Sequence, residues 1–274
     1  MTSIDAREDR LVAITHVPSP RLEQGERTYV EHGAIDFALA RRQHGAYEDA
    51  LRACGATVVR LDANRDLPDC VFVEDTAIVL DEVAVMMSMG AETRRAEPPA
   101  VEHALREYRE IERVELPATI DGGDVVLCGR TLFVGESPRT NAAGIVALRQ
   151  IVSRYGYEVV GVPVRECLHL KTACSALPDG SLLVNPEWID TRPLGSRTLV
   201  RVPETEPWAG DVLVIGECII VSDAFPLTAE LLRRLGWHVI PVSVSEFGKA
   251  EGGVTCMSLV FEATRTAPAT RSEA

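Results

Sequence analysis

The chain repeats one arrangement of polar and apolar positions along most of its length. In each repeat, a polar residue is followed by a short apolar hairpin whose turn contains Gly, Pro, Asp or Glu. The repeats start near Asp75, Asp124, Thr172, Asp211 and Thr255, at intervals of 39 to 49 residues. A spacing in this range is typical of repeat architectures, so we predict five structurally similar units.

Helical patterns separate several of these hairpins. The predicted helical stretches are residues 35–54, 99–110, 141–155 and 228–235, and each precedes a β-branched run. Strands that alternate with helices usually form a parallel sheet, but the tight hairpins inside each unit require antiparallel pairs. Five ββαβ units around one axis satisfy both requirements. The sequence therefore predicts an α/β fold, a five-bladed propeller in which equivalent strand ends converge on the centre.

The propeller accounts for nearly the whole chain. We expect one domain over residues 11–262, between mobile segments at 1–10 and 263–274. With 274 residues, 46% of them apolar, the chain can bury a substantial core. No apolar run approaches the roughly 20 residues of a membrane span, and the charged first residues do not resemble a secretory signal. We expect a cytoplasmic protein.

Charge and cysteine content narrow the class of partner. The formal net charge of −13 argues against nucleic acid, whose phosphates would be repelled, and suits a small cationic substrate. The seven cysteines are scattered without CxxC pairs, which favours reduced thiols over a disulfide framework or a zinc site. We therefore expect no nucleic-acid or membrane partner, no metal and no organic cofactor.

Cys256 is the first candidate for chemistry. It follows Gly252 and Gly253 and precedes an apolar run, so the thiol lies where the chain enters a predicted strand. A cysteine in a strand is usually a small core residue, but the glycines permit the close approach of a ligand. His169 also starts a hairpin and is the only histidine flanked by two leucines. Paired with a thiol, its imidazole could exchange protons near neutral pH.

Acidic residues cluster at two further strand ends. Asp121 opens the turn Asp-Gly-Gly-Asp, where one carboxylate could orient the imidazole as the third member of a Cys-His-Asp set. Asp69, Glu74 and Asp75 surround the apolar residues 70–73, which we predict to form a strand. Buried acids need cationic partners, supplied either by an arginine of the protein or by a guanidinium substrate.

Two arginines could bind a group of opposite charge. Arg94 and Arg139 could hold a carboxylate through paired N–H groups, the geometry that guanidinium groups favour. Because the chain has many arginines, a surface position would explain either of them equally well. The residues alone leave both interpretations open.

Five ordered motifs resemble those of the dimethylarginine dimethylaminohydrolases, a family of the guanidine-modifying superfamily. The motifs are residues 67–75, 121–125, 133–141, 169–171 and 253–256, within a match from about residue 34 to residue 261. The resemblance implies a five-bladed α/β propeller of the pentein type. It also implies hydrolysis of Nω-methyl- and Nω,Nω-dimethyl-L-arginine to L-citrulline and methylamine or dimethylamine.

The resemblance assigns a role to each candidate residue. Cys256 becomes the nucleophile, His169 the acid and base, and Asp121 the carboxylate that positions the imidazole. The implied substrate-binding residues are Asp75 and Glu74 at the guanidinium, Asp69 at the α-ammonium, Arg94 and Arg139 at the α-carboxylate, and Ala250. The reaction would pass through a covalent thiouronium adduct on Cys256.

Departures from the family pattern leave alternatives open. Met257 stands where mammalian members have a second cysteine, and residues 18–33 differ from the mammalian substrate-covering loop. One alternative is another guanidine-modifying hydrolase such as an arginine deiminase, although those enzymes carry an acid where this chain has Lys171. The other is a non-catalytic propeller that acts by binding, like the ribosome anti-association factors. The sequence is compatible with a homodimer.

Overall fold

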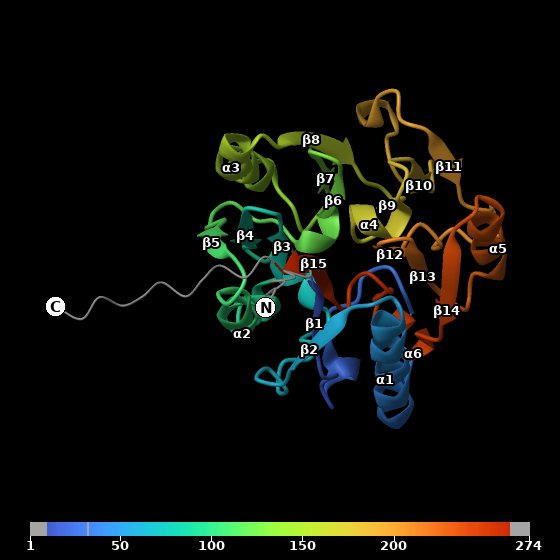
Figure 1. The fold of residues 1–274 in the computed structure, drawn as a ribbon. Helices are drawn as coiled ribbons and strands as arrows, with labels where there is room; N and C mark the ends of the chain where they lie inside the picture. Colours follow the sequence, from blue (N-terminus) through green and yellow to red (C-terminus); the bar gives the residue numbers. More distant parts are fainter. Residues whose placement is uncertain (1–9, 32, 264–274) are drawn as a thin grey trace, which may run out of the picture.

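The protein is a ring of five small sheets. The structure is a computed structural model, and it describes residues 10–31 and 33–263. Within these residues, five three-stranded sheets surround one axis, with the longer helices at the periphery (Figure 1). In every sheet the central strand pairs antiparallel with one neighbour and parallel with the other. The predicted propeller of five ββαβ units is confirmed.

The sheets follow one another along the chain, and the last one is completed by strands from both ends. The first four are β3 (Ala77–Val79), β4 (Val83–Met86) and β5 (Glu110–Arg113); β6 (Val125–Cys128), β7 (Thr131–Glu136) and β8 (Glu158–Pro163); β9 (Cys174–Ala176), β10 (Leu182–Val184) and β11 (Leu199–Arg201); and β12 (Leu213–Ile215), β13 (Cys218–Ser222) and β14 (His238–Val242). The fifth sheet joins β15 (Leu259–Ala263) to β1 (Arg10–His16) and β2 (Thr57–Leu61).

The flanking segments that the sequence predicts to be mobile fall almost wholly outside the described residues, which exclude 1–9 and 264–274. Arg10 and Ala263 belong to those predicted segments, but the structure pairs them with each other at the ends of β1 and β15. The domain therefore includes both residues, and its extent beyond them stays a prediction.

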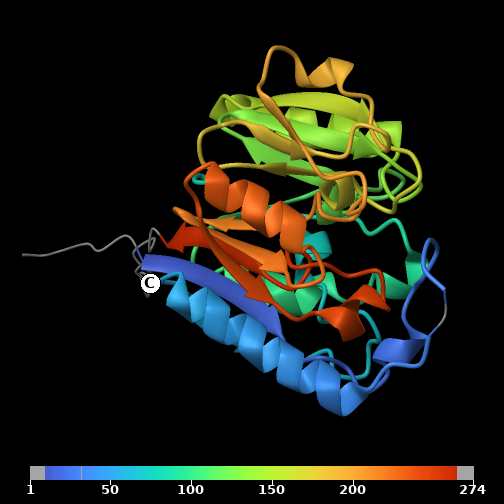
Figure 2. The same ribbon diagram turned by 90° about the vertical axis from the view of Figure 1, so that its right-hand side faces the viewer.

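Four helices connect the second and third strands of their units on the outside of the ring. They are α1 (Phe37–Ala53), α2 (Pro98–Leu105), α3 (Ala142–Val152) and α5 (Pro226–Arg234). Figure 2 shows α1 lying alongside β1. Local sequence sets where helices begin, since the Asp36 carboxylate accepts a hydrogen bond from the Leu39 N–H at 2.9 Å, as expected of a capping residue.

One predicted helix is too long. The sequence pattern predicts a helix over residues 99–110 and a strand at 114–116, but α2 ends at Leu105 and β5 already occupies residues 110–113. The backbone of β5 pairs in parallel with β4. Three of the four residues of this edge strand are charged, so it lacks the apolar alternation that would reveal it.

Five clusters of buried apolar side chains hold the ring together, one at each junction of neighbouring sheets. At one junction, for example, Val85 of β4 belongs to the same cluster as Leu132 and Val134 of β7. The cluster that contains Ala13 of β1 also contains Ile220 of β13. The ring is thus closed by its core as well as by strand pairing.

Candidate active site

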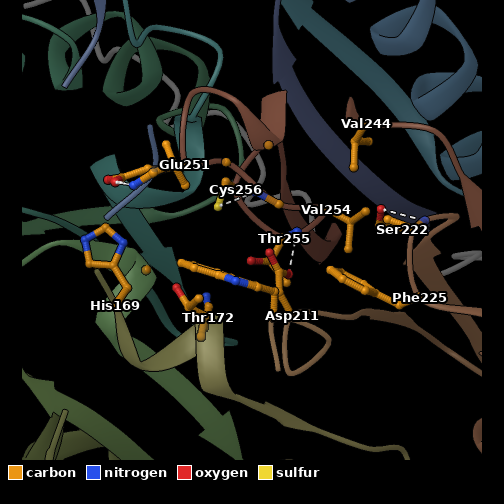
Figure 3. A pocket seen from close by; sticks show the side chains of 18 of the residues that line it. His169, Thr172, Asp211, Ser222, Phe225, Val244, Glu251, Val254, Thr255 and Cys256 are labelled. Atoms are coloured by element: carbon orange, nitrogen blue, oxygen red, sulfur yellow. Dashed lines mark hydrogen bonds between the residues drawn. The ribbon is translucent and has the colours of Figure 1, made fainter. Parts of the chain in front are cut away.

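Each of the five units places an ionisable side chain of the central site two to five residues before its first strand. These residues are Asp75, Asp121, His169, Asp211 and Cys256, which come before β3, β6, β9, β12 and β15 in turn. Figure 3 shows His169, Asp211 and Cys256 around one cavity at the centre of the ring. The predicted convergence of the unit starts is therefore what the structure shows.

The unit starts are short helical turns rather than the strand ends that the sequence predicts. Their elements are η2 (Val73–Thr76), which contains Asp75, η4 (Gly122–Asp124), which follows Asp121, and α4 (Leu170–Ala173), which follows His169. Cys256 also lies in a turn, and β15 starts at Leu259. Residues 70–73 are buried but are not a strand. A short apolar run fits either a buried strand or a buried turn, so the pattern could not distinguish them.

The imidazole of His169 is buried among three carboxylates. Its Nε2 lies 3.3 Å from Oδ2 of Asp121, and its Nδ1 lies 3.7 Å from Oδ1 of Asp75. Burial disfavours the charged ring, but Asp75, Asp124 and Asp121 outweigh burial and raise the pKa of His169 to about 9. The site therefore holds an imidazolium at neutral pH.

Two aspartates of one turn position His169. Asp121 is fully buried behind the imidazole, and its Oδ1 accepts a hydrogen bond from the Gly90 N–H at 2.8 Å. Asp124 accepts a hydrogen bond from the Leu170 N–H at 2.9 Å, which fixes the start of α4. Asp121 therefore holds the ring of His169, while Asp124 holds the backbone next to it.

Asp75 is held by protein groups on both of its oxygens. Its Oδ2 accepts a hydrogen bond from Nη1 of Arg94 at 2.5 Å, and its Oδ1 accepts one from the Gly123 N–H at 3.0 Å. A Cβ atom at Gly123 would lie 2.6 Å from Asp75 and from His169, so this close approach requires glycine. Burial opposes ionisation of Asp75, but the charges of His169 and Arg94 prevail and lower its pKa.

The two candidate arginines have different surroundings. Arg94 is buried and donates hydrogen bonds to Asp75, to both oxygens of Glu97 and to the Phe72 carbonyl oxygen, at 2.5 to 3.1 Å. The family resemblance implies a substrate carboxylate as a partner of Arg94, and in the structure two buried acids, Asp75 and Glu97, already pair with it. In Arg139, by contrast, Nη1 is buried and makes no hydrogen bond among the described residues, and its ion-pair contact with Oδ2 of Asp121 is long, at 3.8 Å.

The Cys256 turn is fixed by its own backbone and by helix α1. The thiol sulfur accepts a hydrogen bond from the Gly253 N–H at 3.4 Å, and the Cys256 carbonyl oxygen accepts one from the Glu74 N–H at 3.1 Å. The Tyr47 hydroxyl of α1 donates to the Val254 carbonyl oxygen at 2.8 Å. Burial raises the pKa of Cys256 well above its ordinary value, and neighbouring carboxylates raise it further. The thiol is therefore protonated at neutral pH until a cation approaches.

Asp211 is a buried carboxyl beside the thiol, and the sequence pattern marks it only as the start of a repeat. Its Oδ1 accepts a hydrogen bond from the Thr255 N–H at 3.1 Å, and a Cβ atom at Gly253 would lie 1.5 Å from its Oδ2. Burial and then the charge of Glu74 raise the pKa of Asp211 to about 7. The repeat could have identified Asp211 as a residue of the site, because Asp75 occupies the equivalent position in another unit.

Replacing Asp211 with asparagine should make the Cys256 thiol more reactive. The amide oxygen can still accept a hydrogen bond from the Thr255 N–H. The substitution removes the negative charge that Asp211 acquires as the pH rises past about 7, and it is this charge that disfavours the thiolate. We expect the pKa of Cys256 to fall and alkylation by iodoacetamide at about pH 8 to be about 3- to 10-fold faster. Rates across a pH series, read from the mass of the Cys256 peptide, measure the effect.

Asp223→Asn is the matched control for this experiment, because Asp223 is an exposed aspartate near the end of the same sheet. Its alkylation rate at Cys256 should equal that of the unmodified chain. The same rate in Asp211→Asn and in the control would contradict the electrostatic effect of Asp211 on the thiol.

A small cavity of about 20 Å³ joins the thiol to most of the predicted substrate-binding residues. Its wall includes Asp69, Asp75, Arg94, Arg139, His169, Ala250 and Cys256. Glu74 lies elsewhere, since its Oε1 accepts a hydrogen bond from Nζ of Lys171 at 2.6 Å and both residues line another cavity. The structure thus brings the predicted residues together, except that Glu74 faces away and Asp121 lies behind the imidazole.

A larger cavity of about 240 Å³ meets the small one at the thiol and the imidazole. Cys256 and His169 line both cavities. The rest of the larger wall comes chiefly from the side of β12, β13 and β14, including Asp211 and Phe225 (Figure 3). The two reactive groups therefore lie between two spaces of different size.

Residues 25–31 are tied to the Cys256 turn beside the small cavity. The Glu26 N–H donates to Oδ2 of Asp69 at 3.0 Å, and Glu26 lines the cavity. Oε1 of Glu251 accepts hydrogen bonds from the backbone N–H groups of residues 28–30. Glu251 has a φ of +60°, an unfavourable conformation for a residue with a side chain, and these three bonds help to hold it.

Asp75, Asp121 and His169 also have the composition of a metal site, since one donor atom of each lies within 4.8 Å of the others. Both oxygens of Asp75 are already hydrogen-bonded to protein groups, and Asp121 contacts the imidazole. Arg94 and the imidazolium supply positive charge next to the carboxylates. The donor set therefore fits a charge-balanced organic site better than a divalent cation.

The fold and these residues define a class. A ring of five ββαβ units with a thiol, an imidazole and carboxylates at its centre is a pentein of the guanidine-modifying type, and the arginine deiminase family model matches residues 63–207. The dimethylarginine dimethylaminohydrolase of Streptomyces coelicolor is 44% identical to this chain over 248 residues, which cover 90% of the chain and 95% of that protein. The chain belongs to the dimethylarginine dimethylaminohydrolase family.

Two solved structures of dimethylarginine dimethylaminohydrolases share the fold. One is a histidine-to-glycine variant in an adduct with S-methyl-L-thiocitrulline, and it has a TM-score of 0.86. The other, from Pseudomonas aeruginosa, is a cysteine-to-serine variant in complex with citrulline, with a TM-score of 0.84. Each is 34% identical to this chain and covers 91% of it, and the match covers 98% of the solved chain. In the part of the chain that the structure describes, no helix is long and apolar enough to cross a membrane.

Proposed function

We propose that the protein hydrolyses Nω-methylated L-arginine to L-citrulline and releases dimethylamine or methylamine. The observation that carries the proposal is the meeting of the Cys256 thiol, the His169 imidazolium and the Asp75 carboxylate in the wall of one small cavity. The Streptomyces coelicolor relative is named for this activity, and the Pseudomonas aeruginosa relative was solved with citrulline, the product of the reaction.

We propose that the substrate lies among the residues that wall the small cavity, with its charges matched at both ends. The cavity itself, at about 20 Å³, is smaller than one methyl group and must widen to admit the substrate. The proposed contacts in the cavity wall are Asp75 for the guanidinium, Asp69 for the α-ammonium, Arg139 and Arg94 for the α-carboxylate, and Ala250 for the aliphatic chain. Glu74, which faces Lys171, supports Asp75 only as a neighbouring charge. Arg139 supports this orientation, because its buried Nη1 makes no hydrogen bond within the described residues and has only a 3.8 Å ion-pair contact with Oδ2 of Asp121, so it can still donate to a carboxylate. Charge-assisted hydrogen bonds of this kind are the stronger ones in proteins.

The first chemical step forms a bond between the thiol sulfur and the guanidinium carbon. Because the substrate is a cation, its binding beside Cys256 lowers the thiol pKa that burial and the carboxylates raise, so the thiol loses its proton to solvent and becomes the thiolate. As the C–S bond forms, the bond from that carbon to the substituted nitrogen breaks. His169 gives its proton to the departing amine.

The second step hydrolyses the thiouronium adduct. His169, now neutral, takes a proton from a water molecule whose oxygen bonds to the same carbon. The C–S bond then breaks and the remaining proton of the added water passes to the sulfur, which gives citrulline and restores the Cys256 thiol. Asp121 is proposed to keep the imidazole in one orientation through both steps.

The alternatives have less support. Lys171 forms an ion pair with Glu74 at the position where arginine deiminases carry an acid. A propeller that acts only by binding would have no use for a buried imidazolium next to a thiol. We also propose that the protein works in the cytoplasm, in line with its seven cysteines, which are all unpaired in the described part of the chain.

Product analysis tests the proposed function. With Nω,Nω-dimethyl-L-arginine, the protein should release citrulline and dimethylamine in equal amounts, and L-arginine should give at least about 10-fold less citrulline. Colorimetric citrulline and chromatographic amine assays measure both products. Ammonia release from L-arginine as the sole activity would show a deiminase instead, and no citrulline from either compound would rule out both enzymes.

A further inference from the structure

We infer that the larger cavity is a binding site for apolar Nω-substituents, so that the enzyme also hydrolyses arginines that carry propyl or benzyl groups. The inference rests on the proposed function, because it concerns the substituent of the same guanidinium. It extends the substrate class from methyl groups to larger alkyl and arylalkyl groups.

The positions of the two cavities determine where a substituent points. The small cavity contains Asp69 and Arg139, which bind the amino-acid end in the proposed function, and Asp75, which binds the guanidinium. The larger cavity contains none of these three residues but shares Cys256 and His169. A guanidinium held by Asp75 within reach of the thiol therefore presents its outer nitrogen to the larger cavity. His169, which gives a proton to that nitrogen, borders both.

The larger cavity exceeds what two methyl groups require. Its volume is about 240 Å³. A water molecule accounts for about 30 Å³ of liquid, and a methyl group is similar in size, so a dimethyl substituent would fill roughly a quarter of the space. A propyl chain or a phenyl ring would use the remaining volume.

The far end of the larger cavity is mainly apolar, although Ser222 lies there too. Figure 3 shows Phe225 and Val244 across the cavity from His169. Trp208 adds a second aromatic side chain, which is supported by an edge-on contact with Trp188 at 4.8 Å between ring centroids. Such a wall gains from contact with apolar groups, and aromatic rings pack best edge to face or offset. It therefore favours an alkyl or arylalkyl group over a charged one.

The chemical step is the same for these substituents. The thiolate sulfur bonds to the guanidinium carbon, the bond to the substituted nitrogen breaks, and His169 gives the amine its proton. The substituent leaves together with that nitrogen, as propylamine or benzylamine. The cavity thus decides which amines the reaction can release, without changing how the bond is broken.

A substrate series with one variable group tests the inference. The protein is assayed for citrulline and for the released amine with Nω-methyl-, Nω-propyl- and Nω-benzyl-L-arginine. We expect kcat/KM for the propyl and benzyl compounds to lie within about 10-fold of the value for the methyl compound. Lower values for both would overturn the inference and leave the proposed function intact. No citrulline from the methyl compound would overturn the proposed function itself.

A variant of the far wall gives a second readout. Phe225→Ala should lower kcat/KM for the benzyl compound about 5- to 10-fold, mainly through KM, and change the methyl compound by less than about 2-fold. Leu227→Ala is the matched control, because Leu227 is an exposed apolar residue two positions further on that does not line the cavity. Equal losses for both substrates in Phe225→Ala would overturn the inference.

Discussion

Replacing Cys256 with serine should abolish citrulline formation from Nω,Nω-dimethyl-L-arginine while the substrate still binds. A serine hydroxyl needs a base to become a nucleophile, but His169 already carries its proton at neutral pH because its pKa is about 9. We expect kcat to fall by at least about 10⁴-fold, with the dissociation constant within about 3-fold of the original. Single-turnover citrulline assays and calorimetric titration measure the two quantities.

Two further measurements distinguish a chemical defect from a misfolded variant. Cys218→Ser is the matched control, since Cys218 is also half-buried and lines neither cavity, and its activity should stay within about 2-fold. In the unmodified chain, 2-chloroacetamidine should label Cys256 faster than the other six cysteines, because the carboxylates attract its cationic head. Turnover by Cys256→Ser above about 1% of the original rate, or faster labelling of another cysteine, would contradict the nucleophilic role.

The place of Cys256 in the repeat shows why much of the site could be predicted. Glycines before Cys256 and leucines around His169 mark the start of a unit in the sequence. The interval between such starts depends on hairpins and turns, which have clear residue preferences. Once the five units close into a ring, starts that are 87 residues apart must lie together, as these two do in the cavity wall.

Side-chain direction could not be predicted in the same way. Glu74 and Asp75 are adjacent, yet Asp75 lines the small cavity while Glu74 pairs with Lys171 beside another. Whether this run forms a strand or a helical turn, its sequence pattern does not predict which of the two adjacent acids faces the centre. The partners of Arg94 could not be predicted either. Glu97 is one of them, and its burial depends on tertiary packing.

Residues that act through backbone groups were also missed. Glu251 accepts hydrogen bonds from N–H groups 221 to 223 residues away in the chain, and no sequence feature of either segment predicts this contact. Asp211 likewise accepts from a backbone N–H of the Cys256 turn. Backbone donors are the same for every residue type except proline, so such contacts leave no compositional signal.

Replacing His169 with glycine should separate substrates by their leaving groups. Dimethylamine cannot leave as an anion, so breaking the C–N bond requires the proton that His169 holds, whereas methanethiolate can leave S-methyl-L-thiocitrulline without one. We expect the first step to slow by about 10²- to 10⁴-fold for dimethylarginine and by less than about 10-fold for S-methyl-L-thiocitrulline. Rapid mixing with assays for dimethylamine and methanethiol measures the first step for each substrate.

The ionisation of His169 also predicts how turnover by the unmodified protein depends on pH. The raised pKa of His169, about 9, means that the imidazole stays protonated below that pH and loses its proton above it. Turnover of dimethylarginine should therefore fall as the pH rises through about 9, and methanethiol release from S-methyl-L-thiocitrulline should not show this decline. His238→Gly, which changes an exposed histidine of β14, should leave both profiles unaltered.

His169 also activates water in the proposed second step, so the His169→Gly variant should trap the first product. An adduct on Cys256 should accumulate with S-methyl-L-thiocitrulline and be visible in the mass of the intact protein, whereas dimethylarginine should form it far more slowly. Equal slowing of both substrates would contradict the role of His169 as an acid for the amine. It would instead point to electrostatics, because without the imidazolium the carboxylates of Asp75 and Asp121 lose the cation between them.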